Sequence, residues 1–279
     1  MTGVEVGGSP DKGPVAVLGA GVMGETLLSG LLRAGRPKES LVISERRPER
    51  AAELTQRYGV RVVDNETAAR EASTVVLVVK PQDMSSVLAE IRNHLSPGTL
   101  VVSLAAGITT ATLEAGLPEG TPVVRVMPNT PALVDQGMAA ISPGAHCDDA
   151  HLAEAEDLLR SCGRVLRIAE RYQDAVTALS GSGPAYIFYV VEAMIEAGVL
   201  LGLPRATSSE LVVQTLYGAA TMLRETGEHP TVLREQVSSP AGTTIAALRQ
   251  LDDHKVRAAF LTAVEAARDR SRELAAGQD

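Results

Sequence analysis

A glycine motif between a short apolar run and a helical pattern constrains this chain more than any other feature. Gly19, Gly21 and Gly24 follow the β-branched run at residues 15–18, and a helical pattern continues from residue 25 to 34. In this context the Gly-x-Gly-x-x-Gly spacing is typical of a dinucleotide-binding turn, because glycines let the backbone approach a pyrophosphate at a helix N-terminus. The alternative is a tight strand-to-helix turn without a ligand.

The same alternation of strand and helix continues through the first part of the chain. Val- and Leu-rich runs without polar alternation are typical of strands buried on both faces, so we predict a parallel sheet with helices on either side. The predicted strands are 15–18, 41–44, 60–63, 74–79, 100–103 and 123–127, and the predicted helices follow at 48–58, after Asn65, 85–94 and 110–117. We therefore predict a flexible tail at 1–13 and an α/β, Rossmann-type doubly wound domain at 14–168.

The remainder, residues 169–279, is predicted to be an all-α domain. Strand patterns stop near Ala178, and helical patterns cover 184–201, 205–226 and 243–276, the last with an interruption near Asp252. Several of these helices are apolar on more than one face, which requires burial. Because the domain has little bulk of its own to cover them, we predict that it dimerises.

Composition and charge exclude several classes of function. The chain has 26 basic and 34 acidic residues, a net charge of -8 and no Trp, which disfavours nucleic-acid binding. Residues 184–201 carry Glu192 and Glu196, so we predict no membrane span. Two cysteines do not make a disulfide scaffold and favour an intracellular protein. His146, Cys147 and His151 lack a standard zinc spacing, so we predict no metal site.

The end of the second predicted strand carries conflicting signals for the cofactor. Glu45 stands where an acidic residue often binds the adenosine ribose of NAD. Arg46 and Arg47 follow at once, and arginines there suit the 2′-phosphate of NADP. We favour NADP(H) and keep NAD(H) possible. A solvated helix start is the alternative role of the arginines.

Later strand ends supply further candidates for the cofactor site. Lys80 ends the fourth predicted strand, small residues at 105 and 106 would let a flat ring approach, and Asn129 could orient an amide or a substrate. The alternatives are a surface lysine and ordinary turn chemistry.

Two segments of the helical half begin helices. Residues 238–244 combine Ser and Thr hydroxyls with a helix start, an arrangement that would hold a carboxylate, although an ordinary capped helix has the same pattern. Residues 180–184 indicate another helix start, with Ser182 as N-cap and Pro184 in the first turn. This segment does not match Gly-x-Ser-x-Gly, which excludes a serine hydrolase.

Taken in order, the motifs resemble pyrroline-5-carboxylate reductase over about residues 14 to 275. They are the glycine motif, Val79-Lys80-Pro81, Ala105-Ala106-Gly107, residues 127–131, residues 179–186 and Ser238-Ser239-Pro240-x-Gly242-x-Thr244. The resemblance implies reduction of 1-pyrroline-5-carboxylate to L-proline with NAD(P)H, the last step of proline biosynthesis, in the cytoplasm. It also implies a homodimer, often assembled into a decamer, with the active site between the cofactor domain of one subunit and helices of the same or the partner subunit.

The resemblance assigns roles by position. Thr244 would donate a hydrogen bond to the imine nitrogen, as the candidate catalytic residue. The implied substrate-binding residues are Ser239, Gly242, Thr243 and Thr244. The implied cofactor-binding residues are Gly19, Ala20, Gly21, Val22, Met23, Gly24, Ser44, Arg46, Arg47, Asn65, Val78, Val79, Lys80, Pro81, Leu104, Ala105, Ala106 and Asn129. Glu45 departs from many relatives, which have an uncharged residue there.

Two other functions are compatible with the glycine motif. β-Hydroxyacid dehydrogenases share the glycine motif but commonly use a lysine on a helix of the second domain. Here residues 178–279 contain one lysine, Lys255, late in the chain, which argues against them. A sensor that binds NADP(H) without turnover would not need the segment at 238–244, so that segment favours an enzyme.

Overall fold

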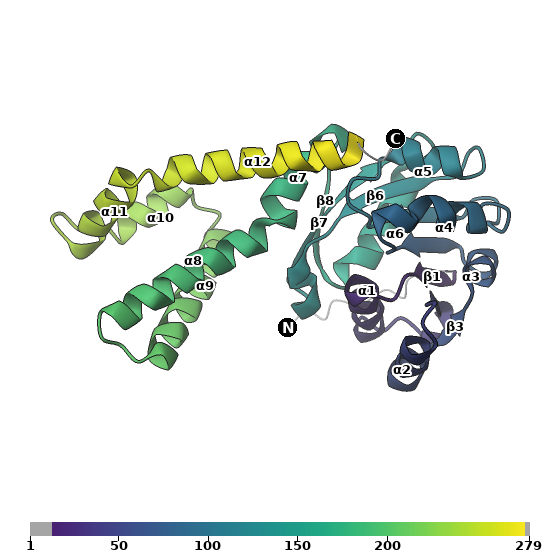
Figure 1. Ribbon diagram of the computed structural model, residues 1–279, viewed down its shortest axis with the longest axis horizontal. Helices are drawn as coiled ribbons and strands as arrows, with labels where there is room; N and C mark the ends of the chain where they lie inside the picture. Colours follow the sequence, from purple (N-terminus) through teal and green to yellow (C-terminus); the bar gives the residue numbers. More distant parts are fainter. Residues whose placement is uncertain (1–12, 277–279) are drawn as a thin grey trace, which may run out of the picture. The chain divides into compact units, whose positions relative to one another are not determined.

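The computed structural model describes residues 13–276, which form two compact units (Figure 1). The first contains the chain up to Gly181 and again from Arg268 onward, and the second is Ser182–Ala267. Of the predicted tail at 1–13, all but Gly13 lies outside the described residues. The domain boundary predicted at 168/169 falls within the first unit.

A doubly wound sheet forms the centre of the first unit. Within residues 13–276 its strand order is β3-β2-β1-β4-β5-β6-β7-β8. The first six strands pair in parallel: β1 (Val15–Leu18), β2 (Leu41–Ser44), β3 (Arg61–Val63), β4 (Thr74–Leu77), β5 (Leu100–Ser103) and β6 (Val123–Met127). The predicted Rossmann-type fold is thereby confirmed. The order reverses at β1, between β2 and β4, and such sheets bind ligands at the carboxyl ends of the strands at this point.

Two strands at one edge of the sheet were missed by the sequence analysis. β7 (Gly137–Pro143) pairs antiparallel with β6, and β8 (Gly163–Arg167) pairs parallel with β7 after the helix α6 (Asp149–Arg160). β8 exposes alternate residues to solvent, which removes the continuous apolar run by which the other strands were recognised. The sheet is therefore parallel over six strands and mixed at this edge.

Side chains on the two faces of the sheet form two separate cores. Val15 and Val17 of β1 pack on one face with α1 (Val22–Arg33), α2 (Pro48–Tyr58) and α6. Ala16 and Leu18 pack on the other with α3 (Asn65–Glu71), α4 (Met84–Ile91) and α5 (Thr110–Gly116). Because consecutive strand residues point to opposite faces, four buried residues in a row require a covered sheet on both sides.

A buried arginine fastens the segment that leaves the sheet. Arg125 of β6 lies with only 7% of its side chain exposed, and its Nη1 is 3.1 Å from Oε1 of Glu170. The Glu170 carboxylate also accepts hydrogen bonds from the backbone N–H of Thr110, at 2.8 Å, and from its hydroxyl, at 2.6 Å. Nearby, Nε2 of the buried Gln173 donates to Oγ of Ser142 at 2.8 Å. Residues 170–173 are thus tied to β6, β7 and α5.

Helices make up the second unit. They are α8 (Gly183–Leu200), α9 (Arg205–Thr226), α10 (Pro230–Gln236), α11 (Thr243–Asp253) and the first part of α12 (Val256–Ala276). Ser208 of α9 is buried and its hydroxyl donates to the carbonyl of Ile195 in α8 at 2.9 Å, which joins these two helices. The predicted all-α second domain is confirmed.

The helices of the second unit expose large apolar side chains. None of the residues of α8 is buried within the described chain, and Phe188, Tyr189 and Leu200 are 66%, 75% and 87% exposed. Large apolar side chains exposed in this number on one helix indicate an interaction site. Within the described residues, one helical run, 170–200, is long and apolar enough to cross a membrane. This judgement rests on its length and composition alone.

The predicted helix start at Ser182 is confirmed in position but not in the role of its hydroxyl. Ser182 is the N-cap residue of α8 and Pro184 lies in the first turn, as predicted. The Ser182 hydroxyl makes no capping hydrogen bond within the described chain, and its backbone has helical angles. Helix α7 (Gln173–Val176) passes into a π-helical turn, Thr177–Gly181, directly before Ser182, so the chain enters α8 from another helical segment.

We expect Arg125→Ala to lower the free energy of unfolding by about 2–4 kcal/mol, because it leaves the Glu170 carboxylate without its buried partner. The exposed pair Arg61–Glu71, with Arg61 59% exposed, offers a matched control, and Arg61→Ala should cost at most about 1 kcal/mol. Urea denaturation at one fixed protein concentration measures both. Equal losses would show that the Arg125–Glu170 pair does not fasten this segment.

Candidate active site

The glycine turn at the end of β1 brings three chain segments into close contact. The N–H of Gly19 donates to the carbonyl of Ser44 at 3.0 Å, and the N–H of Val78 donates to the carbonyl of Leu18 at 2.8 Å. Gly19 has a φ of +99°, and a Cβ on Gly24 would lie 2.0 Å from the Gly19 carbonyl oxygen. Only glycine is tolerated at these two positions, so the turn itself explains both.

The N-terminus of α1 is open to a ligand. Gly21 is its N-cap residue and is exposed, and no side chain of the described residues caps the helix there. A Cβ on Gly21 would meet no atom within 4 Å, so the turn does not require glycine at this position. The exposed N–H groups and the helix dipole suit a phosphate or pyrophosphate. The chain therefore fits the dinucleotide that its spacing predicts.

A carboxylate in the first turn of α1 is neutralised by its neighbours. Glu25 accepts hydrogen bonds from the guanidinium of Arg50, from Tyr58 at 2.8 Å and from Arg57 at 2.9 Å. Burial raises the pKa of Glu25, but these hydrogen bonds outweigh it and the net pKa is lowered. Arg50 also lies 3.5 Å from the carbonyl oxygen of Ala20. The negative charge nearest the anion site is thus offset.

At the end of β2, the Glu45 carboxylate forms an ion pair with Arg47, two residues later in the chain. The carboxylate accepts the backbone N–H of Arg47 at 2.9 Å and the guanidinium of Arg47 at 3.0 Å through each oxygen. These contacts with Arg47 hold the pKa of Glu45 below its usual value. Only 8% of the Glu45 side chain is exposed, against 67% for Arg47. Glu45 is therefore engaged within its own loop.

Arg46 points to a different carboxylate, which the sequence analysis missed. Nη2 of Arg46 lies 2.9 Å from Oε1 of Glu90, a residue of α4. Oε2 of the same carboxylate accepts a hydrogen bond from Nδ2 of Asn65 at 2.6 Å. The structure thus brings together two predicted adenosine-site residues, Arg46 and Asn65, through a residue distant from both in sequence.

The ends of β4 and β5 lie at the same edge of the sheet. Lys80 is exposed, and its carbonyl accepts the N–H of Asp83 at 2.9 Å as the chain enters a short 3-10 helix, Pro81–Asp83. The N–H of Leu104 donates to the carbonyl of Leu77 at 2.9 Å, and Ala105 is buried while Ala106 is exposed. That a flat ring approaches these small side chains stays a prediction.

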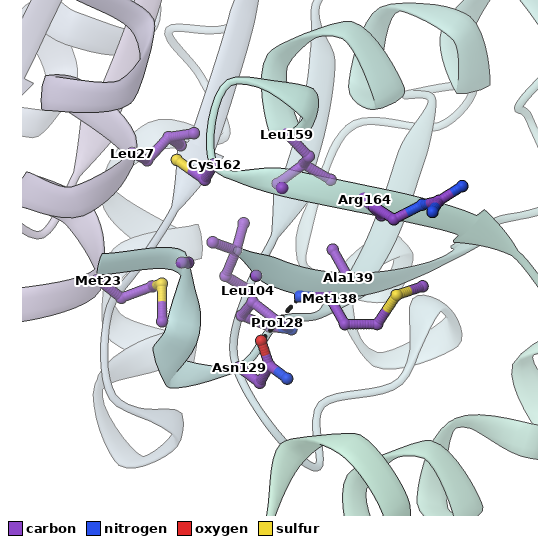
Figure 2. Close-up of a pocket in the computed structure, with 13 residues that line it drawn as sticks. Met23, Leu27, Leu104, Pro128, Asn129, Met138, Ala139, Leu159, Cys162 and Arg164 are labelled. Atoms are coloured by element: carbon purple, nitrogen blue, oxygen red, sulfur yellow. Dashed lines mark hydrogen bonds between the residues drawn. The ribbon is translucent and has the colours of Figure 1, made fainter. Parts of the chain in front are cut away.

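Asn129 serves the loop after β6. Its Nδ2 donates to the carbonyl of Ser180 at 3.1 Å, and its Oδ1 accepts the N–H of Met138 at 2.8 Å (Figure 2). Both ends of the amide are thus engaged with backbone of the first unit. This favours the turn-chemistry alternative for its side chain, and contact of residue 129 with a cofactor stays a prediction.

A small pocket lies beside this loop. Its volume is about 20 Å³, and Met23, Leu104, Asn129 and Cys162 are among its lining residues (Figure 2). Such a volume holds about one water molecule and is too small for a dinucleotide. Burial raises the pKa of the Cys162 thiol, which keeps it protonated at neutral pH.

The predicted substrate segment lies in the second unit, at the start of α11. Gly242 is the N-cap residue in extended conformation, and no side chain in the described part of the chain caps this helix. The N–H of Gly242 donates to the carbonyl of Ser239 at 3.0 Å, which closes a turn in which Ala241 has a φ of +59°. Thr244 is half-buried and Thr243 is exposed. Open N–H groups and two hydroxyls at one helix terminus suit a carboxylate.

Family models match both parts of the chain. One described as pyrroline-5-carboxylate reductase dimerisation matches residues 170–274. Another, described as NADP oxidoreductase coenzyme F420-dependent, matches residues 14–107. The second match covers the glycine turn and the strand ends that carry Arg46, Asn65 and Lys80.

Similar proteins cover nearly the whole chain. A pyrroline-5-carboxylate reductase of Corynebacterium melassecola is 50% identical over 93% of this chain and 98% of its own length. One from Mycobacterium tuberculosis is 44% identical over 93% of this chain and 96% of its own length. Among solved structures, a pyrroline-5-carboxylate reductase of Coxiella burnetii superposes with a TM-score of 0.91 at 36% identity, covering 95% and 99% of the two chains. The NADP-bound pyrroline carboxylate reductase of Plasmodium falciparum superposes with a TM-score of 0.84 at 31% identity, covering 94% and 98%.

We expect Gly21→Ala to weaken the binding of NADPH at least about tenfold while the thermal unfolding midpoint stays within about 2 °C, because the added methyl group is free of the protein but blocks a ligand. Gly24→Ala is the contrasting variant and should lower stability as well. Calorimetric titration and thermal scans separate the two. Unchanged NADPH binding by Gly21→Ala would favour a turn without a ligand.

Proposed function

This chain belongs to the pyrroline-5-carboxylate reductase family, and from that premise we infer that it reduces 1-pyrroline-5-carboxylate to L-proline by hydride transfer from NAD(P)H, the final step of proline biosynthesis. The observation that carries this function is the match of both halves of the chain, at 50% identity, with a reductase of that name along almost its whole length. The uncapped N-terminus of α1 supports a nicotinamide dinucleotide as cofactor, independently of that match.

Hydride transfer to the C=N bond requires the protein mainly to bind and orient the cofactor and the substrate. A bound nicotinamide cofactor supplies the hydride that reduces the C=N bond. The N–H groups at the start of α1 hold its pyrophosphate, and the small residues Ala105 and Ala106 leave room for its ring. A protonated imine is already electrophilic, so the side chains need to place the reacting atoms rather than to provide a strong acid.

We propose that the start of α11 binds the substrate. The N–H groups after Gly242, together with the hydroxyls of Ser239 and Thr243, receive the carboxylate. Thr244 donates a hydrogen bond to the imine nitrogen and orients the ring. Its half-buried position supports this role, because a hydroxyl shielded from water makes a stronger and better-directed hydrogen bond.

For the cofactor we propose a preference for NADP(H), with NAD(H) also used. Arg46 and Arg47 are 62% and 67% exposed at the end of β2, where a 2′-phosphate would be recognised. The bound NADP of the similar Plasmodium falciparum reductase supports the same choice. The engagement of Glu45 by Arg47 supports it as well, because that carboxylate is already occupied.

The chain forms homo-oligomers through its dimerisation domain. We propose a homodimer in which a second copy covers the exposed apolar side chains of α8 and α9, and further assembly into a decamer. In this arrangement the apolar helix at 170–200, which carries Glu192 and Glu196, is an oligomer interface and not a membrane span. A cytoplasmic location is supported by Cys147 and Cys162, both free thiols in the described chain.

Purified protein given 1-pyrroline-5-carboxylate should oxidise NADPH, and NADH with a higher KM. We expect Arg46→Ala to raise the KM for NADPH about tenfold through loss of a charge-assisted contact, and to leave the KM for NADH within about twofold. Steady-state assays with both cofactors measure this. Absence of substrate-dependent turnover with either cofactor would contradict the reductase function, and equal effects on both KM values would contradict the role of Arg46.

We expect Thr244→Ala to lower kcat/KM for 1-pyrroline-5-carboxylate about 10- to 100-fold, because one hydrogen bond to the reacting ring is lost. Thr244→Ser keeps the hydroxyl and should recover most of the activity, and the Kd for NADPH should not change. Thr262 of α12, whose hydroxyl bonds to its own helix at 3.1 Å, provides the control Thr262→Ala. An unchanged kcat/KM in Thr244→Ala would exclude this role.

A further inference from the structure

Glu90 is the one acidic side chain that joins two proposed adenosine-site residues in the described structure. Its carboxylate accepts a hydrogen bond from Arg46 at 2.9 Å through Oε1 and from Asn65 at 2.6 Å through Oε2. The hydroxyl of Ser86, one helical turn earlier, lies 3.4 Å from Oε1. The carboxylate is therefore held between the ends of β2 and β3 by donors on both sides.

The two arginines at the end of β2 are each paired with a different carboxylate. Arg47 is paired with Glu45 inside one loop, whereas Arg46 is paired with Glu90 from another helix. Glu90 keeps 38% of its side chain exposed, against 8% for Glu45, so it is the carboxylate that an incoming ligand meets. Both positive charges are thus balanced before a cofactor binds.

We propose that Glu90 is a specificity-determining residue that limits the preference of this enzyme for NADP(H) over NAD(H). It does so by competing with the 2′-phosphate for Arg46, while its second oxygen holds Asn65 in position. This inference rests on the proposed function, which places the adenosine 2′-position beside Arg46.

The ion pair between Arg46 and Glu90 gives the direction and size of the effect. For the Arg46 guanidinium to bind a 2′-phosphate, it must give up its hydrogen bond to Glu90. An exposed ion pair of this kind shifts such an equilibrium by up to about fivefold, so removal of the Glu90 charge should tighten binding of the 2′-phosphate about two- to fivefold. The 2′-hydroxyl of NADH carries no charge, so its binding is not opposed in this way.

The exposure of the pair allows this competition. Arg46 is 62% exposed and Glu90 is 38% exposed, and exposed ion pairs contribute little to stability, so the guanidinium can move to a phosphate. Asn65 does not need to move, because its contact is with the other oxygen of the carboxylate. Glu90 therefore acts on cofactor choice through Arg46 and not through the reacting atoms.

The test is Glu90→Gln in the full-length enzyme, which removes the charge and keeps an amide of the same shape. We expect the Kd for NADPH to fall about two- to fivefold and the Kd for NADH to stay within about twofold, measured by calorimetric titration. Glu90→Ser, which shortens the side chain, should change the two Kd values in the same selective way. A thermal scan of each variant confirms that it is folded.

A control and a second background make the result specific. Glu66 neighbours Asn65, is 55% exposed and faces His94, so Glu66→Gln removes a charge nearby without touching Arg46. It should change the Kd for NADPH less than twofold. On the Arg46→Ala background, Glu90→Gln should lower the Kd for NADPH less than twofold, because the competition needs the Arg46 guanidinium.

The outcomes separate this inference from the proposed function. If Arg46→Ala weakens NADPH selectively but Glu90→Gln leaves both Kd values unchanged, or shifts both equally, the role of Glu90 is excluded and the proposed adenosine site stands. If Arg46→Ala has no selective effect on NADPH, the placement of the 2′-position is wrong and the inference falls with it. If Glu66→Gln and Glu90→Gln lower the Kd for NADPH equally, the effect is a general one of charge and the specific role of Glu90 is excluded.

Discussion

The close approach of backbone at Gly19 and Gly24 is the contact on which the first unit depends. A Cβ on Gly24 would lie 2.0 Å from the Gly19 carbonyl oxygen, so any side chain there would push α1 away from β1. With α1 in place, its apolar face completes one of the two cores, and its N-terminus faces outward beside the ends of β2 and β4. The packing of the fold and the opening of the anion site thus have one cause.

Charge around this site is arranged in neutral pairs. Arg50 and its neighbours offset Glu25, Arg47 engages Glu45, and Glu90 engages Arg46. The exposed pair of Arg46 and Glu90 contributes little to stability, so it keeps Arg46 in position and still lets the guanidinium bind another anion. Anion binding at such a site depends on which ion pairs open. The net charge of -8 gives the chain no general electrostatic attraction for an anionic ligand.

The helical unit obeys a different constraint. α8 buries none of its residues within the described chain, so the hydrophobic effect that organises the sheet has no counterpart in this helix. In the first unit, Arg125 and Gln173 instead hold residues 170–173 on the sheet with buried polar contacts, which are directional. Different forces therefore act on the segment at 170–173 and on the exposed face of α8.

The sequence by itself determined the features that depend on neighbours in the chain. The glycine turn, the six parallel strands, the helix at 48–58 and the break before α12 follow from local sterics and from apolar runs. It did not reveal β8, in which no residue is buried, or the π-helical turn Thr177–Gly181 that precedes α8. Nor did it reveal Glu90 beside Arg46 or the backbone partners of Asn129, because those contacts join residues far apart in sequence. Local periodicity carries no information about such pairs. They form only when α4 packs on the sheet and β7 pairs with β6 in the folded chain.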